Sequence, residues 1–223
     1  MLDLGCAAGD LAAELESRGA RVIGMDNNPE LLQQAQARNL VTAEFRLHDL
    51  RDIPPSGEKA DGIWCSFTAA YFPDFLPVLE SWARLVKPGG WLALVEVDDL
   101  FGHEPLPARQ KALLEAYIQE SLEARRYDYR MGGKLSDFLA RAGWKVSGEF
   151  QVPDAELAFD GPATPEVLRA WGERLDRLIS LRKFCGDDFE ELRGEFMNCL
   201  ASSRHLSRAR VCCRLAHLRY SQR

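Results

Sequence analysis

Short apolar runs alternate with segments of helical periodicity over the first 99 residues. The apolar runs are nearly continuous, which is typical of strands buried on both faces of a parallel sheet. They lie at residues 2–4, 21–26 and 91–97. Apolar residues at helical spacing occupy residues 10–18, 29–38 and 75–86. Alternating strands and helices need right-handed crossovers, so this half predicts a doubly wound α/β fold with helices on both faces.

The pattern changes after residue 99, where a polar and aromatic loop precedes longer amphipathic segments. Helices are predicted at 108–126, 134–142, 165–182 and 189–200, and strands at 144–152 and 209–219. We expect a single domain, residues 1–223, with helical insertions at about 100–133 and 160–205 that cap a substrate site. A detached helical tail is the alternative for the second insertion.

The first strand runs through Gly5 and Gly9 directly into a helix. Such a turn lets the backbone approach a nucleotide-like ligand and offers it free N–H groups. Asp26 ends the next strand, 17 residues after Gly9, where these folds bind ribose hydroxyls. A dinucleotide fingerprint needs glycine where this chain has Ala7 and Asp10. Asp10 would repel a pyrophosphate but tolerate a sulfonium, so the turn favours S-adenosylmethionine (SAM) over a nicotinamide dinucleotide.

Five segments, in order and at ordinary spacing over residues 1–99, carry a resemblance to a known family. They are LDLGCAAGD, VIGMDNNPELLQQA, FRLHDLRDIP, ADGIWCSFTAAYFPD and LVKPGGWLALVEVDD. Together they resemble the motifs of class I SAM-dependent methyltransferases, of the small-molecule type found in ubiquinone and menaquinone biosynthesis. The resemblance implies a Rossmann-like, mostly parallel seven-stranded sheet whose last strand is antiparallel.

The resemblance also implies roles for the matching residues. Asp26 would bind the ribose hydroxyls, Asn27 would border the adenine, and Asp49 would hold its amino group. The cofactor residues implied in this way are Asp3, Gly5, Cys6, Ala7, Gly9, Asp26, Asn27, Asp49, Leu50 and Ser66. Ala7 departs from the family, which commonly has glycine there. Taken alone, Asp26 and Asp49 are equally well explained as caps of the next helix or turn.

Methyl transfer is an in-line displacement, so the protein contributes alignment, desolvation and, where needed, removal of a proton. Candidate side chains follow the fourth and fifth strands, because open α/β sheets bind ligands at the carboxyl ends of their strands. We predict His103 as a general base, since histidine titrates near neutrality, and Tyr71 as a second catalytic residue. A surface histidine is the alternative for His103.

The amino-acid composition disfavours several other kinds of partner. The net charge is −6, from 34 acidic and 28 basic residues, which disfavours a nucleic-acid partner. No apolar run reaches 18 residues and no signal peptide is evident, so we expect a soluble cytoplasmic protein without a membrane partner. The six cysteines lack metal-ligand spacing, so no metal is expected.

The sequence therefore predicts a SAM-dependent methyltransferase that acts on an oxygen, nitrogen or carbon atom of a small metabolite, and a homodimer is the assembly we expect. A catalytically idle SAM-binding scaffold is the first alternative, and a nicotinamide-dependent oxidoreductase is the second. The family usually places a helix or two before the first strand, whereas this chain begins inside that strand. We expect a segment upstream of Met1, and a stop codon immediately before it would contradict this expectation.

Overall fold

The computed structural model describes residues 1–53 and 59–218. Pro54 of the third motif and Arg219 at the predicted end of the last strand lie outside the described residues.

The described residues form a seven-stranded sheet of order β3-β2-β1-β4-β5-β9-β7. Its strands are β1 (Leu2–Leu4), β2 (Ile23–Asp26), β3 (Glu44–Leu47), β4 (Ala60–Ser66), β5 (Val86–Asp98), β7 (Trp144–Val152) and β9 (Arg210–Leu218). The first five are parallel, and β9 runs antiparallel between β5 and β7. The predicted fold class is confirmed, including the antiparallel last strand.

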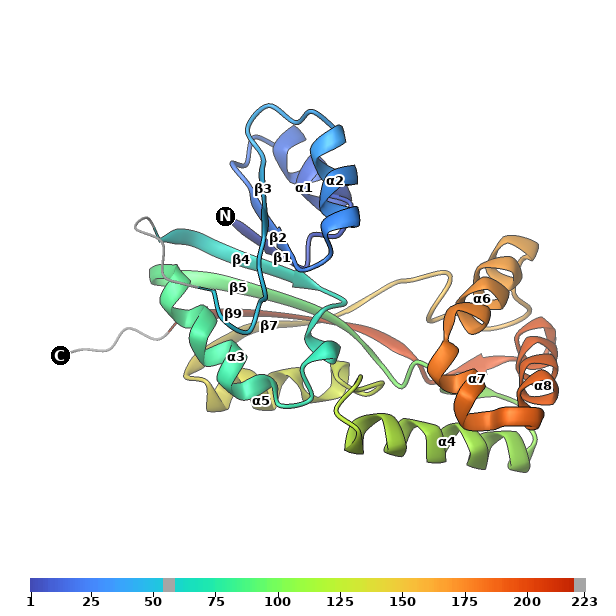
Figure 1. Ribbon diagram of the computed structural model, residues 1–223. Coiled ribbons are helices and arrows are strands. Elements are labelled where there is room, and N and C mark those ends of the chain that lie inside the picture. The colour runs from blue at the N-terminus through green and yellow to red at the C-terminus, as the bar shows by residue number, and fades with distance from the viewer. Residues whose placement is uncertain (54–58, 219–223) are drawn as a thin grey trace.

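Helices cover both faces of this sheet, as Figure 1 shows. On one side lie α1 (Asp10–Ser17) and α2 (Pro29–Ala37), and on the other lie α3 (Phe75–Trp82) and α5 (Leu135–Arg141). Single turns of 3₁₀ helix occur at η1 (Ala69–Tyr71), η2 (Ala83–Leu85), η3 (Gly132–Lys134) and η4 (Gly186–Asp188). The side chains of α3 and α5 bury a first apolar core against β1, β4 and β5.

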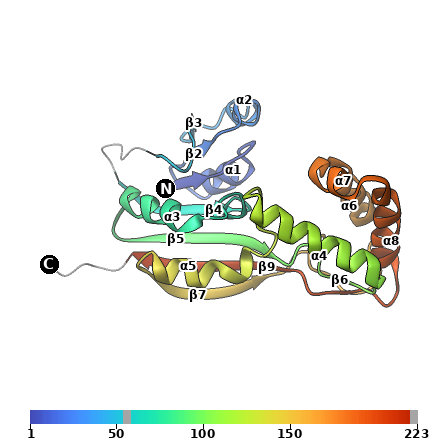
Figure 2. The same cartoon turned by 60° about the horizontal axis from the view of Figure 1, so that its bottom comes forward.

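A second group of helices lies beyond the carboxyl ends of the parallel strands (Figures 1 and 2). It consists of α4 (Ala108–Glu123), α6 (Pro165–Arg177), α7 (Ile179–Cys185) and α8 (Phe189–Ala201). These helices share a second apolar core with the end of β5, and we call them the helical group. They occupy the two insertions predicted from the sequence.

Three local features differ from the sequence predictions. The helix expected at 165–182 breaks at Leu178, whose ψ of 69° leaves the helical range, so that α6 and α7 bury Leu175 and Leu181 separately. Residues 87–90, which separate the helix predicted at 75–86 from the strand predicted at 91–97, form an irregularity within β5, since Val86 pairs with Ala60 and Trp91 pairs with Gly62.

The third difference is a two-stranded ribbon that the sequence did not indicate. It joins β6 (His103–Glu104) to β8 (Leu206–Ser207) and so ties the chain entering the helical group to the chain leaving it. Two-residue strands are too short to produce a periodic pattern. In the described part of the chain, no helix combines the length and apolar character needed to span a bilayer.

Candidate active site

The turn between β1 and α1 takes a shape that depends on its small residues. Gly5 and Gly9 have φ of 79° and 77°, in the left-handed region that glycine adopts without strain. A Cβ on Gly5 would lie 2.0 Å from Thr68 Oγ1, so β1 and the segment after β4 can approach only because this side chain is absent. Ala7 also has a positive φ, 45°, and its methyl group departs from the glycine usual in the resembled family.

The carboxylate of Asp26 fixes this turn from the neighbouring strand. Its Oδ2 accepts the amide N–H of Ala7 and its Oδ1 accepts that of Asn28, each at 2.9 Å. The N-cap of α2 is Asn28, whose side chain accepts the N–H groups of Glu30 and Leu31. Asp26 is therefore not the cap of α2, but its bond to Asn28 caps the turn before that helix, as the alternative interpretation allowed.

A cavity of about 710 Å³ opens beside this turn. Nine of the ten predicted cofactor residues line it: Asp3, Gly5, Cys6, Ala7, Asp26, Asn27, Asp49, Leu50 and Ser66. Gly9 does not line the cavity; it precedes α1 and its Cα faces Phe45 and Ala35, where a Cβ would lie 2.9 and 3.0 Å from their side chains. The structure thus brings together residues separated by more than 60 positions in the sequence.

Asp3 is buried at the base of this cavity, with 2% of its surface exposed. Within the described residues its Oδ2 atom has no hydrogen-bond partner. Burial, reinforced by the charge of Asp26, raises the pKa of Asp3 from 3.8 to about 7. A buried carboxyl in this state favours a cationic ligand, because a positive charge nearby stabilises its ionised form.

Acidic side chains predominate among the charged residues that line this cavity. Four aspartates line the cavity against a single arginine, Arg51. Asp49 Oδ2 and Arg51 Nη2 lie 2.6 Å apart, and Asp49 Oδ1 also accepts the Arg51 amide N–H, so Asp49 does cap a turn. Asp10 pairs with Arg38, which lies outside the lining. The remaining excess of carboxylates disfavours a pyrophosphate at this position.

The segment after β4 closes one side of the cavity with aromatic rings. Phe67 and Tyr71 both line it and remain 44% and 62% exposed. Beneath them Glu96 of β5 is 1% exposed, and its Oε1 accepts the amide N–H of Ala70 at 3.1 Å. Burial raises the pKa of Glu96 from 4.5 to about 7. Glu96 therefore holds the turn that presents Tyr71, a role that sequence reasoning missed.

A second cavity, of about 350 Å³, adjoins the first and shares Phe67 and Tyr71 with it. Tyr71 packs edge-on against Tyr127, with ring centroids 4.9 Å apart. Burial raises the pKa of both phenols, so both stay protonated at neutral pH. The other side of this cavity comes from the chain after β7 and from α6, through Asp154, Glu156, Leu157 and Arg174.

His103 does not lie at either cavity, which corrects the prediction of a general base. It is 2% exposed and stacks on His205, whose Nε2 lies 2.9 Å from His103 Nδ1. Burial lowers its pKa to about 3, so the ring is neutral at physiological pH. The surface alternative is also wrong, because the rings of Phe159, Trp171 and Phe196 surround His103.

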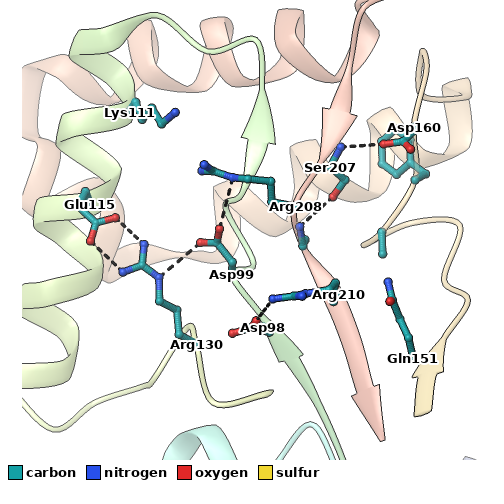
Figure 3. A pocket seen from close by; sticks show the side chains of 13 residues that line it. Asp98, Asp99, Lys111, Glu115, Arg130, Gln151, Asp160, Ser207, Arg208 and Arg210 are labelled. Carbon is teal, nitrogen blue, oxygen red and sulfur yellow. Dashed lines mark hydrogen bonds and ion pairs between the residues drawn. The ribbon is translucent and has the colours of Figure 1, made fainter. Parts of the chain in front are cut away.

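A further cavity, of about 770 Å³, is drawn in Figure 3. Asp98 at the end of β5 and Asp99 after it point into this cavity rather than into the two adjoining cavities. There Asp98 pairs with Arg210 at 2.8 Å, and Asp99 faces Arg130 at 3.5 Å. Its acidic and basic side chains neutralise one another, and it shares no lining residue with the two adjoining cavities.

Comparison with known proteins agrees with this geometry. Residues 1–90 match the model of a methyltransferase domain. This similarity is to a methyltransferase domain, and the matched region holds both glycines of the first turn together with Asp26, Asp49 and Tyr71.

The curated relatives of this chain have low sequence identity to it. A ubiquinone biosynthesis O-methyltransferase of Xanthomonas campestris is 27% identical over 158 residues, which cover 69% of this chain and 63% of the relative. The chain thus spans less than two thirds of that relative's length.

Two solved structures show the same fold. A putative methyltransferase of Bacillus halodurans superposes with a TM-score of 0.64 and 16% identity, covering 97% of this chain and 90% of the other. A phosphoethanolamine N-methyltransferase 2 of Haemonchus contortus, in complex with S-adenosyl-L-methionine, superposes with a TM-score of 0.60 and 18% identity. This superposition covers 99% of this chain and 48% of the other.

Proposed function

We propose that the chain is a SAM-dependent methyltransferase that transfers a methyl group to a small molecule. The observation that carries the proposal is the 710 Å³ cavity, where nine residues predicted from sequence motifs converge at the carboxyl ends of β1, β2, β3 and β4. The family-model match to residues 1–90 and the SAM complex of the Haemonchus enzyme support the choice of cofactor.

The residues present fit SAM by charge and by shape. The unpartnered carboxyl of Asp3 would face the positively charged methionine end, beside the backbone of Gly5 and Ala7. Asp26 has lone pairs left beyond its two N–H bonds, so its oxygens can also accept ribose hydroxyls. Asn27, Asp49 and Leu50 would border the adenine.

When bound, SAM supplies a methyl group on an activated sulfonium. The chain's own residues would align the acceptor with that methyl and exclude water from the line of attack. Phe67 and Tyr71 stand between the two cavities, so their rings would border the reacting atoms on one side. The protonated Tyr71 hydroxyl can donate a hydrogen bond to the acceptor, and we propose it as a catalytic residue.

The other functions considered from the sequence find less support. A nicotinamide dinucleotide would place its pyrophosphate against the aspartates of the cavity lining. A SAM-binding scaffold without catalysis would not need the second cavity, which adjoins the first at Phe67 and Tyr71. An assembly as a homodimer stays a prediction. The cytoplasmic location also stays a prediction, in keeping with six unpaired cysteines.

Calorimetric titration of the full chain with SAM and with NADH tests the proposal. We expect saturable heat with SAM and none with NADH, and weaker SAM binding in Asp26→Ala. Formation of S-adenosylhomocysteine with a panel of small metabolites then tests turnover. Absence of SAM binding would refute the proposal, whereas SAM binding without turnover on any compound would favour the scaffold.

A further inference from the structure

The smaller cavity combines an aromatic wall with one cationic side chain. Phe67, Tyr71 and Tyr127 supply the rings, and Val97, Leu100 and Leu157 complete the apolar surface. Arg174 of α6 lines the same cavity from the helical group. This inference rests on the proposed function, because it takes the cavity as the place where the methyl acceptor binds.

Arg174 is held in a fixed orientation. Its Nη2 donates to Glu156 Oε1, and its guanidinium carbon lies 5.1 Å from the centroid of the Trp171 ring. Trp171 is fully buried and is itself anchored, since its Nε1–H donates to the Glu156 carbonyl oxygen at 2.7 Å. Glu156 thus binds the guanidinium through its side chain and, through its carbonyl oxygen, holds the Trp171 ring against which the guanidinium lies.

The guanidinium keeps donor capacity for a ligand. An arginine side chain has five N–H donors, and among the described residues only Glu156 accepts from this one. Nε is buried without a partner there, while Nη1 makes no hydrogen bond within residues 1–53 and 59–218. Because the side chain is 29% exposed, an oxygen atom entering the cavity can reach it.

The charged side chains around the cavity determine which kind of chemical group can bind beside Arg174. Asp154 and Glu156 line it together with Arg174. An anionic group would accept from Arg174 but face both carboxylates. An ammonium group would be attracted by both carboxylates but has no lone pair for Arg174, so the guanidinium would stay without an acceptor. An uncharged carbonyl or hydroxyl oxygen accepts from the guanidinium and is not repelled by the carboxylates as an anion would be.

We propose that Arg174 is a specificity-determining residue, which recognises an uncharged oxygen on a flat, aromatic methyl acceptor stacked against Tyr71 and Tyr127. The acceptor would enter with its ring between the two tyrosines and the apolar wall. Its oxygen would bind Arg174 at the end of the cavity that the helical group supplies.

Three small probes of one shape test this assignment: acetophenone, benzoate and benzylamine. They share a phenyl ring and carry an uncharged oxygen, an anion and a cation at neutral pH. Each is titrated by ligand-observed NMR into the full chain saturated with S-adenosylhomocysteine. Acetophenone is expected to bind with the lowest Kd. Arg174→Met should raise that Kd by about tenfold, as when a hydrogen bond to a charged group is lost.

Arg177→Met is the matched control, because Arg177 lies on the same helix, is 72% exposed and does not line the cavity. Its Kd for acetophenone should equal that of the wild type. If Arg174→Met fails to fold, Arg174→Lys serves instead, since it keeps the charge and stem but has one nitrogen to share between Glu156 and a ligand. It too should weaken acetophenone binding.

The outcomes separate this inference from the proposed function. Failure of the wild type to bind S-adenosylhomocysteine would refute both. Normal binding of that compound with an unchanged acetophenone Kd in the Arg174 variants would overturn only the role of Arg174, as would absence of binding by all three probes. Tighter binding of benzoate or benzylamine would overturn the uncharged acceptor.

Discussion

At neutral pH and above, the buried carboxyl of Asp3 is expected to destabilise the folded chain, although the same carboxyl favours binding of a cationic ligand. Its pKa is raised from 3.8 to about 7 by burial and by Asp26. The folded chain therefore holds this proton more tightly than the unfolded chain, so the free energy of unfolding falls as pH rises from about 4 to about 7. At about 1.4 kcal/mol for each pKa unit, the full effect is on the order of 4 kcal/mol.

Asp3→Asn removes the ionisation and keeps the size and polarity of the side chain. The variant should match the wild type in stability near pH 4 and exceed it by up to roughly 4 kcal/mol at pH 8. Urea unfolding followed by circular dichroism at pH 4.5, 6 and 8 measures this. The difference between the two proteins isolates Asp3, because Glu96 and His103 titrate equally in both.

Binding of SAM should change in the opposite sense. A cation favours the ionised carboxylate, so the affinity of the wild type for SAM should rise with pH up to about pH 7 and then level off. Asp3→Asn should bind SAM about tenfold more weakly at pH 8, without this rise. Calorimetric titrations between pH 5.5 and 8.5 provide the profile.

Asp137→Asn is the control for both measurements. Asp137 lies on α5, is 70% exposed and, within the described ranges, pairs with Arg141 of its own helix alone. Its stability and SAM affinity should follow the wild type at every pH. If Asp3→Asn showed the same dependence of stability on pH as the wild type, the reasoning about its buried carboxyl would be wrong.

Three further changes test other parts of the structure. Asp26→Ala should weaken SAM binding by about 1 to 3 kcal/mol, measured by calorimetry, because a charged hydrogen-bond acceptor is lost; an unchanged Kd would remove Asp26 from the site. Gly5→Ala should destabilise the fold by roughly 3 kcal/mol in urea unfolding, since its φ is 79° and the new Cβ would meet Thr68, and equal stability would contradict this geometry. The depressed pKa of His103 means that folding stability is lost as pH falls from about 6.5 towards 3, and His103→Phe should reduce that loss; an unaltered acid limb would refute it.

The cofactor half of the fold could be predicted because its signals are local. Each strand from β1 to β4 ends in, or is followed within a few residues by, the carboxylate, glycine or serine that lines the cavity. Topology then places these residues together, since parallel strands present their carboxyl ends at one edge. One further signal was present and unused: Glu96 is the single charged residue in the apolar run 91–97, which indicates a buried carboxyl with a specific partner.

The helical group and the chain around it, which line the proposed acceptor cavity, could not be predicted in the same way. His103 looked like a loop residue because its burial depends on His205, 102 positions later, and on rings from α6 and α8. Arg174 reads from the sequence as one of several polar residues of an amphipathic helix. Its orientation comes from Glu156, 18 positions earlier, and from the ring of Trp171, and neither contact produces a periodic pattern.

The antiparallel pairing of β7 with β9 has a consequence for how such a chain can diversify. Val152 and Val211 are partners across this pair, and residues 153–209 leave and rejoin the sheet between these two strands. Segments of very different length and composition can therefore be exchanged at this point while the register of the sheet is kept. Evolution can in this way replace the wall that selects the acceptor and leave the nucleoside cradle at the opposite end of the sheet order untouched.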